Sequence, residues 1–322
     1  MRRGYLVAAA LGAVLLVMAF ASTWGWWGAS RIEKDATFVV PSGSSLTGVA
    51  AKLEKEGLIG SSESFLLWSK LLGGRDPIKA GEFLLPAGTP PSGILDILQH
   101  GEVIRRFVTI PEGMPSIMVW ERLMAEPLLT GTVPMPEEGS VLPESYDFER
   151  GESRAAVLAR MQKAMSDTLA ELWARRAPGI AVKTPREAII LASIVEKETS
   201  VPAEHRMVAG LYYNRVRQRM PLQADPTIIY PITKGKPLGR RIRQSEIRAV
   251  NGYNTYTRVG LPEGPITNPG RASIEAVLNP ATTNALYMVA NGEGGHVFAD
   301  TLAEHNRNVA RWFAIRRARG EM

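Results

Sequence analysis

The run TPREAIILASIVEKE, residues 184–198, decides how most of this chain of 322 residues folds. It opens with the capping residue Thr184, a proline suited to the first helical position, and a glutamate that completes a capping box. Residues 188–195 follow and are apolar or small almost all round, which is typical of a helix buried inside a domain. The sequence therefore predicts a buried helix that ends in two carboxylates, Glu196 and Glu198.

The end of this helix offers a candidate acid. A carboxyl group there loses hydration, and desolvation favours the protonated form that a general acid needs. Residues two apart point about 200° apart on a helix, so only one of the two glutamates can address a given substrate atom. Glu196 shares its face with the small residues Ala192 and Ser193, whereas Glu198 falls behind larger ones. We therefore predict Glu196 as the catalytic acid; the alternative is that both are exposed and paired with nearby cations.

Two polar and aromatic loops, 220–227 and 253–256, supply the context for this acid. Sugars offer hydroxyl and acetamide groups to Gln, Asn and Asp, and their C–H faces to aromatic rings. Each of these residues taken alone is equally well a turn former or a core aromatic. The predicted saccharide contacts are Gln223, Asp225, Tyr253, Asn254 and Tyr256.

Length and composition exclude several classes of protein. The length corresponds to about two domains of roughly 150 residues each, and 45% hydrophobic with 22% charged residues is normal for a folded chain. The absence of cysteine excludes thiolate nucleophiles, cysteine-bound zinc and disulfides. His205, His296 and His305 lack the spacing of a metalloprotease, so we expect no metal and no cofactor. The net charge of +6 comes without a zinc-finger or RNA-binding signature, so we expect no nucleic-acid partner.

The N-terminus predicts a membrane anchor. Residues 4–30 carry no charge, and their apolar run is long enough, at ~1.5 Å per residue, to cross about 30 Å of hydrocarbon. Arg2 and Arg3 before it favour a cytoplasmic N-terminus. The alternative is a cleaved signal peptide ending near residues 19–21. Both place the rest of the chain on the periplasmic side of the inner membrane.

The pattern predicts an α+β protein in three parts. Residues 1–30 are the cytoplasmic N-terminus and the transmembrane helix. Residues 31–101 hold a juxtamembrane linker and a small β-α-α-β module. Residues 102–322 form a larger mixed domain that contains the buried glutamate-bearing helix, a hairpin at 286–299 and a final helix from about 302 to 317.

Several motifs in fixed order together resemble one family, the endolytic murein transglycosylases or YceG-like proteins. They are LASIVEKET (191–199), YNR (213–215), LQADPT (222–227), YNTY (253–256), GLP (260–262) and NPG (268–270). The chain departs from the usual family pattern at residues 143–146, at 251–252 and at Glu263. These departures concern loop shapes and remove no reactive group.

The resemblance implies cleavage of the β-1,4 bond between N-acetylmuramic acid and N-acetylglucosamine within peptidoglycan strands, which limits the length of nascent strands. Glu196 would protonate the leaving oxygen and then take the proton from the muramoyl C6 hydroxyl, which closes a 1,6-anhydro ring. The resemblance adds Ser193, Glu198 and Asn214 as substrate contacts. It also implies a LysM-like character for the small module and penicillin-binding proteins as partners.

Two other functions remain open. A lysozyme-type hydrolase would pair Glu196 with Asp225, because hydrolysis with retention or inversion uses two carboxyl groups. A noncatalytic scaffold would hold the wall through its small module and recruit the synthases.

Overall fold

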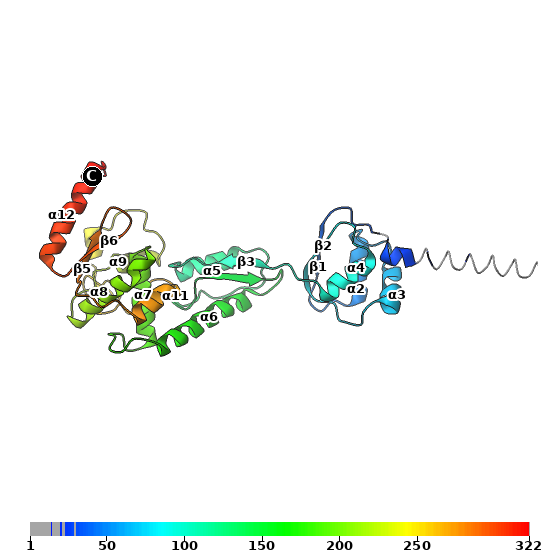
Figure 1. Cartoon of the computed structure of the whole chain (residues 1–322), viewed down its shortest axis with the longest axis horizontal. Coiled ribbons are helices and arrows are strands. Elements are labelled where there is room, and N and C mark those ends of the chain that lie inside the picture. The colour runs from blue at the N-terminus through cyan, green and yellow to red at the C-terminus, as the bar shows by residue number, and fades with distance from the viewer. Residues whose placement is uncertain (1–13, 15–19, 21–22, 29, 322) are drawn as a thin grey trace, which may run out of the picture. The chain divides into compact units, whose positions relative to one another are not determined.

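The computed structural model describes residues 14, 20, 23–28 and 30–321 of the chain. These residues form two compact units, which divide between Arg106 and Phe107 (Figure 1). Both units combine helices with two-stranded sheets, so the fold is a mixed α+β one.

The prediction of an N-terminal transmembrane helix is corrected by this structure. In the part of the chain that is described, no helix combines the length and the apolar character needed to span a bilayer. Most of the predicted span at residues 1–30 lies outside the described residues; of it, 14, 20, 23–28 and 30 are described.

The N-terminal unit contains the predicted succession of a strand, two helices and a returning strand, followed by a third helix. The two strands pair antiparallel, with Phe38 opposite Phe83, and both rings are fully buried. Ser45 and Ser61 cap the first two helices through their side chains. The elements are β1 (Ala36–Val40), α2 (Leu46–Lys55), α3 (Ser62–Leu72), β2 (Gly81–Leu85) and α4 (Pro91–His100).

The C-terminal unit begins with a two-stranded sheet and two helices. They share a core that includes Val119, Phe148 and Met161, each almost inaccessible to solvent. The sequence did not predict the second strand, because its segment follows a long loop rich in Pro and Gly. The elements are β3 (Arg106–Thr109), α5 (Ser116–Ala125), β4 (Ser145–Phe148) and α6 (Arg154–Ala174).

The predicted buried helix is α7 (Pro185–Glu198), and residues 188–195 are all buried. It contacts four other helices of the unit, which is why it is apolar almost all round. The Thr184 hydroxyl accepts a hydrogen bond from the backbone N–H of Glu187 at 3.1 Å. The Glu187 carboxylate reaches the N–H of Lys183, one residue before the position that a capping box predicts.

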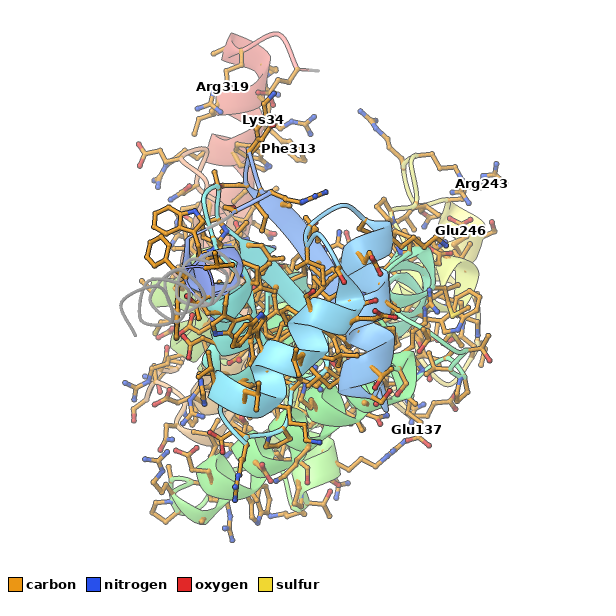
Figure 2. The ribbon with its side chains drawn as sticks, turned by 90° about the vertical axis from the view of Figure 1, so that its right-hand side faces the viewer. Lys34, Glu137, Arg243, Glu246, Phe313 and Arg319 are labelled. Carbon is orange, nitrogen blue, oxygen red and sulfur yellow. The ribbon has the colours of Figure 1, made fainter. Side chains whose placement is uncertain are left out.

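Further helices follow α7 along the chain, and several of them pack against it. They are the 3₁₀ turn η1 (Pro202–Glu204), α8 (His205–Arg217), α9 (Pro226–Thr233), α10 (Gln244–Ile247) and α11 (Arg271–Leu278). At the exposed edge of the unit, the backbone N–H of Arg243 donates to Glu246 at 2.7 Å; Figure 2 labels both residues.

The predicted hairpin consists of β5 (Tyr287–Ala290) and β6 (His296–Ala299), which pair antiparallel. Asn291 holds the turn, because its side-chain oxygen accepts from the N–H groups of Glu293 and Gly295. The last helix, α12 (Leu302–Ala318), packs on this hairpin and has no buried residue; Figure 2 labels Phe313 and Arg319 on it.

Candidate active site

Glu198, the last residue of α7, holds a carboxyl group that is largely withdrawn from water. Its Oε1 atom is buried and accepts no hydrogen bond from any residue that the structure describes. Burial raises the pKa of Glu198 to about 7, and the nearby charge of Asp225 acts in the same direction. The Tyr212 hydroxyl and the charge of Arg215 act in the opposite direction. Near neutral pH this group exists in both its acid and its base form.

Asp225 and Tyr256 bring the two polar loops to this carboxyl group. The Tyr256 hydroxyl donates to Asp225 Oδ1 at 2.6 Å. The charges of Asp225 and Glu198 and the burial of the ring raise the pKa of Tyr256, so the phenol stays protonated and remains a donor. Both loops that sequence reasoning connected to saccharide binding thus meet beside Glu198.

Two buried threonines tie these loops together. The hydroxyls of Thr227 and Thr255 lie 2.8 Å apart, and Thr255 also accepts from the N–H of Ala224 at 3.0 Å. Gln223 donates its backbone N–H to the Thr255 carbonyl at 3.1 Å and adopts a left-handed backbone with φ of 52°. Such a backbone costs a residue other than glycine on the order of 1 kcal/mol, so the surrounding contacts must impose it. The result is an exposed Gln223 side chain on a fixed loop.

Arg215 on α8 joins the hairpin to the same loop. Its buried guanidinium donates to the carbonyls of Leu286 at 2.7 Å and Leu222 at 2.8 Å. Its positive charge also favours the ionised form of Glu198. Arg215 therefore holds the hairpin and the loop before α9 together next to Glu198.

The structure gives three of the predicted saccharide contacts a structural role instead. Ser193 is fully buried, donates to the Ile190 carbonyl at 2.7 Å and accepts from the N–H of Ile266 at 3.1 Å. Asn214 donates to the carbonyls of Thr283 and Ala285.

Asn254 is fully buried as well. Its amide nitrogen lies within 3.3 Å of the carbonyls of Glu246, Ile247 and Ala249, and its oxygen accepts from the N–H of Tyr256 at 2.9 Å. The asparagine thus closes the turn that presents Tyr256. Its polar atoms are thus bonded within the protein, and its contact with a sugar stays a prediction.

Tyr253 is partly exposed and is connected through Tyr230 to a second desolvated carboxyl group, that of Glu138, which the sequence did not single out. Its ring packs against the ring of Tyr230 at 4.8 Å between centroids. The Tyr230 hydroxyl bonds to Glu138, which also accepts from the N–H of Ser116 at 2.9 Å. Burial raises the pKa of Glu138. The only signal in the sequence was the long loop that carries Glu138, which the family resemblance includes.

Glu196, the predicted acid, lies in different surroundings. Its Oε2 accepts from the N–H of Gly270 at 3.0 Å, at the start of α11, where the helix dipole favours a negative charge. Burial and the charge of Glu196 raise the pKa of the neighbouring Glu112. Asp225 and Tyr256 of the polar loops thus lie near Glu198, whereas Glu196 accepts a hydrogen bond at the start of α11.

The histidines do not form a metal centre within the described part of the chain, where no group of three His, Asp or Glu side chains is arranged to hold an ion. His296 instead pairs with Glu204 at 2.8 Å, and His205 lies 3.2 Å from the Thr199 carbonyl.

Comparison with known proteins identifies the family. A model of the YceG-like family matches residues 38–311. The chain belongs to the YceG-like family. That match confirms the resemblance seen in the sequence motifs, and it contains all the residues around Glu198 and Glu196 described above.

Several relatives of this YceG-like chain have known names or structures. The Bacillus subtilis protein named endolytic murein transglycosylase is 27% identical over 312 residues, which covers 86% of this chain and 85% of the relative. The Streptococcus pneumoniae protein of the same name is 28% identical over 328 residues; the match covers 86% of this chain but 58% of that longer protein. A crystal structure of a YceG-like protein from Listeria monocytogenes matches with a TM-score of 0.52 and 26% identity, covering 85% of this chain and 98% of the other.

Proposed function

We propose that this YceG-like protein is an endolytic lytic transglycosylase of peptidoglycan. It would cut the β-1,4 bond between N-acetylmuramic acid and N-acetylglucosamine within glycan strands and so limit their length. The names of the relatives support the activity. The main observation in support of Glu198 as the site of this activity is its desolvated carboxyl group beside the two polar loops.

In the proposed reaction Glu198 acts first as acid and then as base. The protonated carboxyl group donates its proton to the glycosidic oxygen as the bond from this oxygen to C1 breaks. The resulting carboxylate takes the proton of the C6 hydroxyl while O6 forms its bond to C1, which leaves a 1,6-anhydro end. No water is consumed, and the proton balance of Glu198 is restored. A pKa of about 7 suits both halves of this exchange.

The neighbours of Glu198 have distinct parts in this proposal. Arg215 and the Tyr212 hydroxyl stabilise the carboxylate between the two proton transfers, because both favour the ionised form. The exposed side chain of Gln223 and the partly exposed rings of Tyr253 and Tyr256 offer a sugar one amide and two aromatic faces. The catalytic role predicted for Glu196 passes to Glu198, and Glu196 supports α11.

A lysozyme-type hydrolase is the second candidate, because a specific observation favours it. The charge of Asp225 reaches Glu198 strongly enough to raise its pKa. Hydrolysis needs such a second carboxylate, either as nucleophile or as base for a water. We place this function second because the Asp225 oxygen already accepts from Tyr256 and the named relatives are transglycosylases.

Further parts of the proposal concern location and partners. Because the substrate is the cell wall, the catalytic unit would act outside the cytoplasm. The β-α-α-β module, bounded by 31–101 in the sequence, would hold glycan as a LysM-like domain. The catalytic domain would span 102–322, as the sequence pattern predicts, and penicillin-binding proteins would be its partners on the family resemblance alone.

Digestion of purified sacculi tests the proposed function. Wild-type protein and Glu198→Gln are incubated with sacculi, and the released muropeptides are separated and weighed by mass spectrometry. We expect anhydro ends from the wild type and none from the variant. Products heavier by one water, with reducing ends, would establish the hydrolase instead. Absence of any release by the wild type would favour the noncatalytic scaffold.

A further inference from the structure

A cavity of about 470 Å³ opens in the C-terminal unit, and the last turn of α7 contributes to its wall. Its walls are mostly apolar and come from the segment before α5 and the start of that helix, from α9 and the segment after it, and from the segment before α11; Met118, Ile229 and Ile266 are among the apolar residues. Three charged residues also line it: Glu112, Lys197 and Lys236. The reaction proposed above uses none of these side chains.

Two residues that line the cavity are next in sequence to Glu198 and to Asp225. Lys197 directly precedes Glu198, and Pro226 directly follows Asp225. Lys197 and Glu198 are adjacent in the last turn of α7, so the cavity begins at the same helix end as the candidate acid. Gly235, with φ of +85°, brings the opposite wall close, because a side chain there would meet Pro115 at 2.7 Å. The cavity is thus a built feature of the unit.

Two of the three charged side chains on its wall form no ion pair within the described part of the chain. The Lys197 ammonium group has one long hydrogen bond, to the Gly113 carbonyl at 3.4 Å, and pairs with no carboxylate among the described residues. Lys236 pairs with Glu121, and both are partly exposed. Glu112 is partly desolvated and forms no ion pair within the described part of the chain. The cavity therefore suits an occupant with small apolar groups, a carboxylate and an ammonium group.

We propose that this cavity binds the stem peptide of the muramic acid residue whose glycosidic bond is cut. This inference rests on the proposed function. A stem peptide is attached to the lactyl group of that sugar and carries alanine methyl groups, a carboxylate and the amino group of a diamino acid. The methyl groups would contact Met118 and Ile229, the carboxylate Lys197, and the amino group Glu112. The enzyme would thereby prefer strands that still carry peptides over denuded strands.

The test compares two substrates prepared from the same sacculi. One is glycan strands with intact stems, and the other is strands from which an amidase has removed the stems. The full chain is assayed on both, and the ratio of the cleavage rates is measured for the wild type, Lys197→Gln and Met118→Trp. Lys163→Gln, an exposed lysine on α6, is the matched control.

We expect a wild-type ratio of about tenfold in favour of intact strands, a difference of about 1.4 kcal/mol. Lys163→Gln keeps this ratio. Lys197→Gln and Met118→Trp each bring it to about twofold or less, the first by removing a charge and the second by filling the cavity. Because Lys197 is exposed, its variant decides the matter even if Met118→Trp fails to fold.

Two results overturn the inference: a wild-type ratio near one, or a ratio that Lys197→Gln leaves at the wild-type value. Either result leaves the proposed function intact, since strands are still cut. Failure of the wild type to cut both substrates contradicts the proposed function itself, so the two failures are distinguishable.

Discussion

The two carboxyl groups at the end of α7 stand two residues apart and have different neighbours. Around Glu198 lie a buried tyrosine and arginine of α8 and an aspartate that precedes α9. Around Glu196 lie the backbone N–H of Gly270, the residue that precedes α11, and the carboxyl group of Glu112. The Glu198 carboxyl group is withdrawn from water and has no backbone N–H donor among the described residues. The Glu196 carboxyl group has such a donor, the N–H of Gly270.

The chemistry at this helix end is therefore set by the residues that pack against it. Two glutamates of one helix turn have the same intrinsic pKa, so any division of labour comes from desolvation, hydrogen bonds and charges. Glu198 is desolvated and lies near the charges of Asp225 and Arg215, which suits proton transfer. Glu196 accepts a backbone hydrogen bond, which suits a structural carboxylate.

The largest expected effect separates the two regions by activity. Glu198→Gln should lower the rate of glycan cleavage about 1,000-fold, within the range for loss of a general acid. Glu196→Gln should lower it less than about tenfold, since a glutamine there still accepts from the N–H of Gly270. Rates of soluble muropeptide release from sacculi measure both. A larger loss for Glu196→Gln than for Glu198→Gln would reverse the assignment.

The next effect concerns stability and follows from the raised pKa of Glu198. The folded-state pKa of about 7 lies above the ordinary 4.5, so the folded protein loses stability as pH rises from 4.5 through 7. The loss is on the order of 3 kcal/mol and is fully present above pH 7.

Glu198→Gln should therefore unfold at higher denaturant concentration than the wild type at pH 8, and at nearly the same concentration at pH 4. Glu102→Gln, an exposed glutamate, is the control and should show no such change. Equal stability of wild type and Glu198→Gln at pH 8 would mean that the carboxyl group is well solvated.

Much of the fold could be predicted from the sequence, because the signals are local. The cap at Thr184, the apolar run of α7 and the turn at Asn291 each lie within a few residues of the element they define. The order of strands and helices in the N-terminal unit follows for the same reason.

The site could be predicted only in part. The loops that carry Gln223 and Tyr256 do converge, but the choice between the two glutamates depended on Tyr212, which packs against Glu198 from another helix. Neighbours on α7 alone pointed to Glu196. Asn254 resembles a sugar ligand in the sequence, and only the turn it closes shows that its polar atoms are used.

A third prediction tests whether Asn254 serves the Glu198 region as a scaffold. Asn254→Ala should lower the free energy of unfolding by about 2 kcal/mol, because buried carbonyls lose their donor. Denaturant unfolding of the full chain measures the change. A matched exposed residue, Asn306→Ala on α12, should change it by less than about 0.5 kcal/mol. If Asn254→Ala keeps full stability and weakens substrate binding alone, Asn254 is a sugar ligand after all.

The smallest effect is a shift in pH dependence. The negative charge of Asp225 raises the pKa of Glu198, so Asp225→Asn should lower it. Because the reaction starts from the protonated acid, the alkaline limb of the profile of kcat/KM should move to lower pH. Asp167→Asn on α6 should leave the profile in place. A shift to higher pH, or none, would contradict the proximity of the two carboxyl groups.

Direct titration of the Glu198 carboxyl group tests the central claim most closely. The full chain is labelled with 13C at the glutamate side-chain carboxyl carbon, and the Glu198 signal is assigned by its loss in Glu198→Gln. We expect a midpoint near pH 7. A midpoint near the ordinary value of 4.5 would show a solvated carboxylate and would rule out Glu198 as an acid that is protonated at neutral pH.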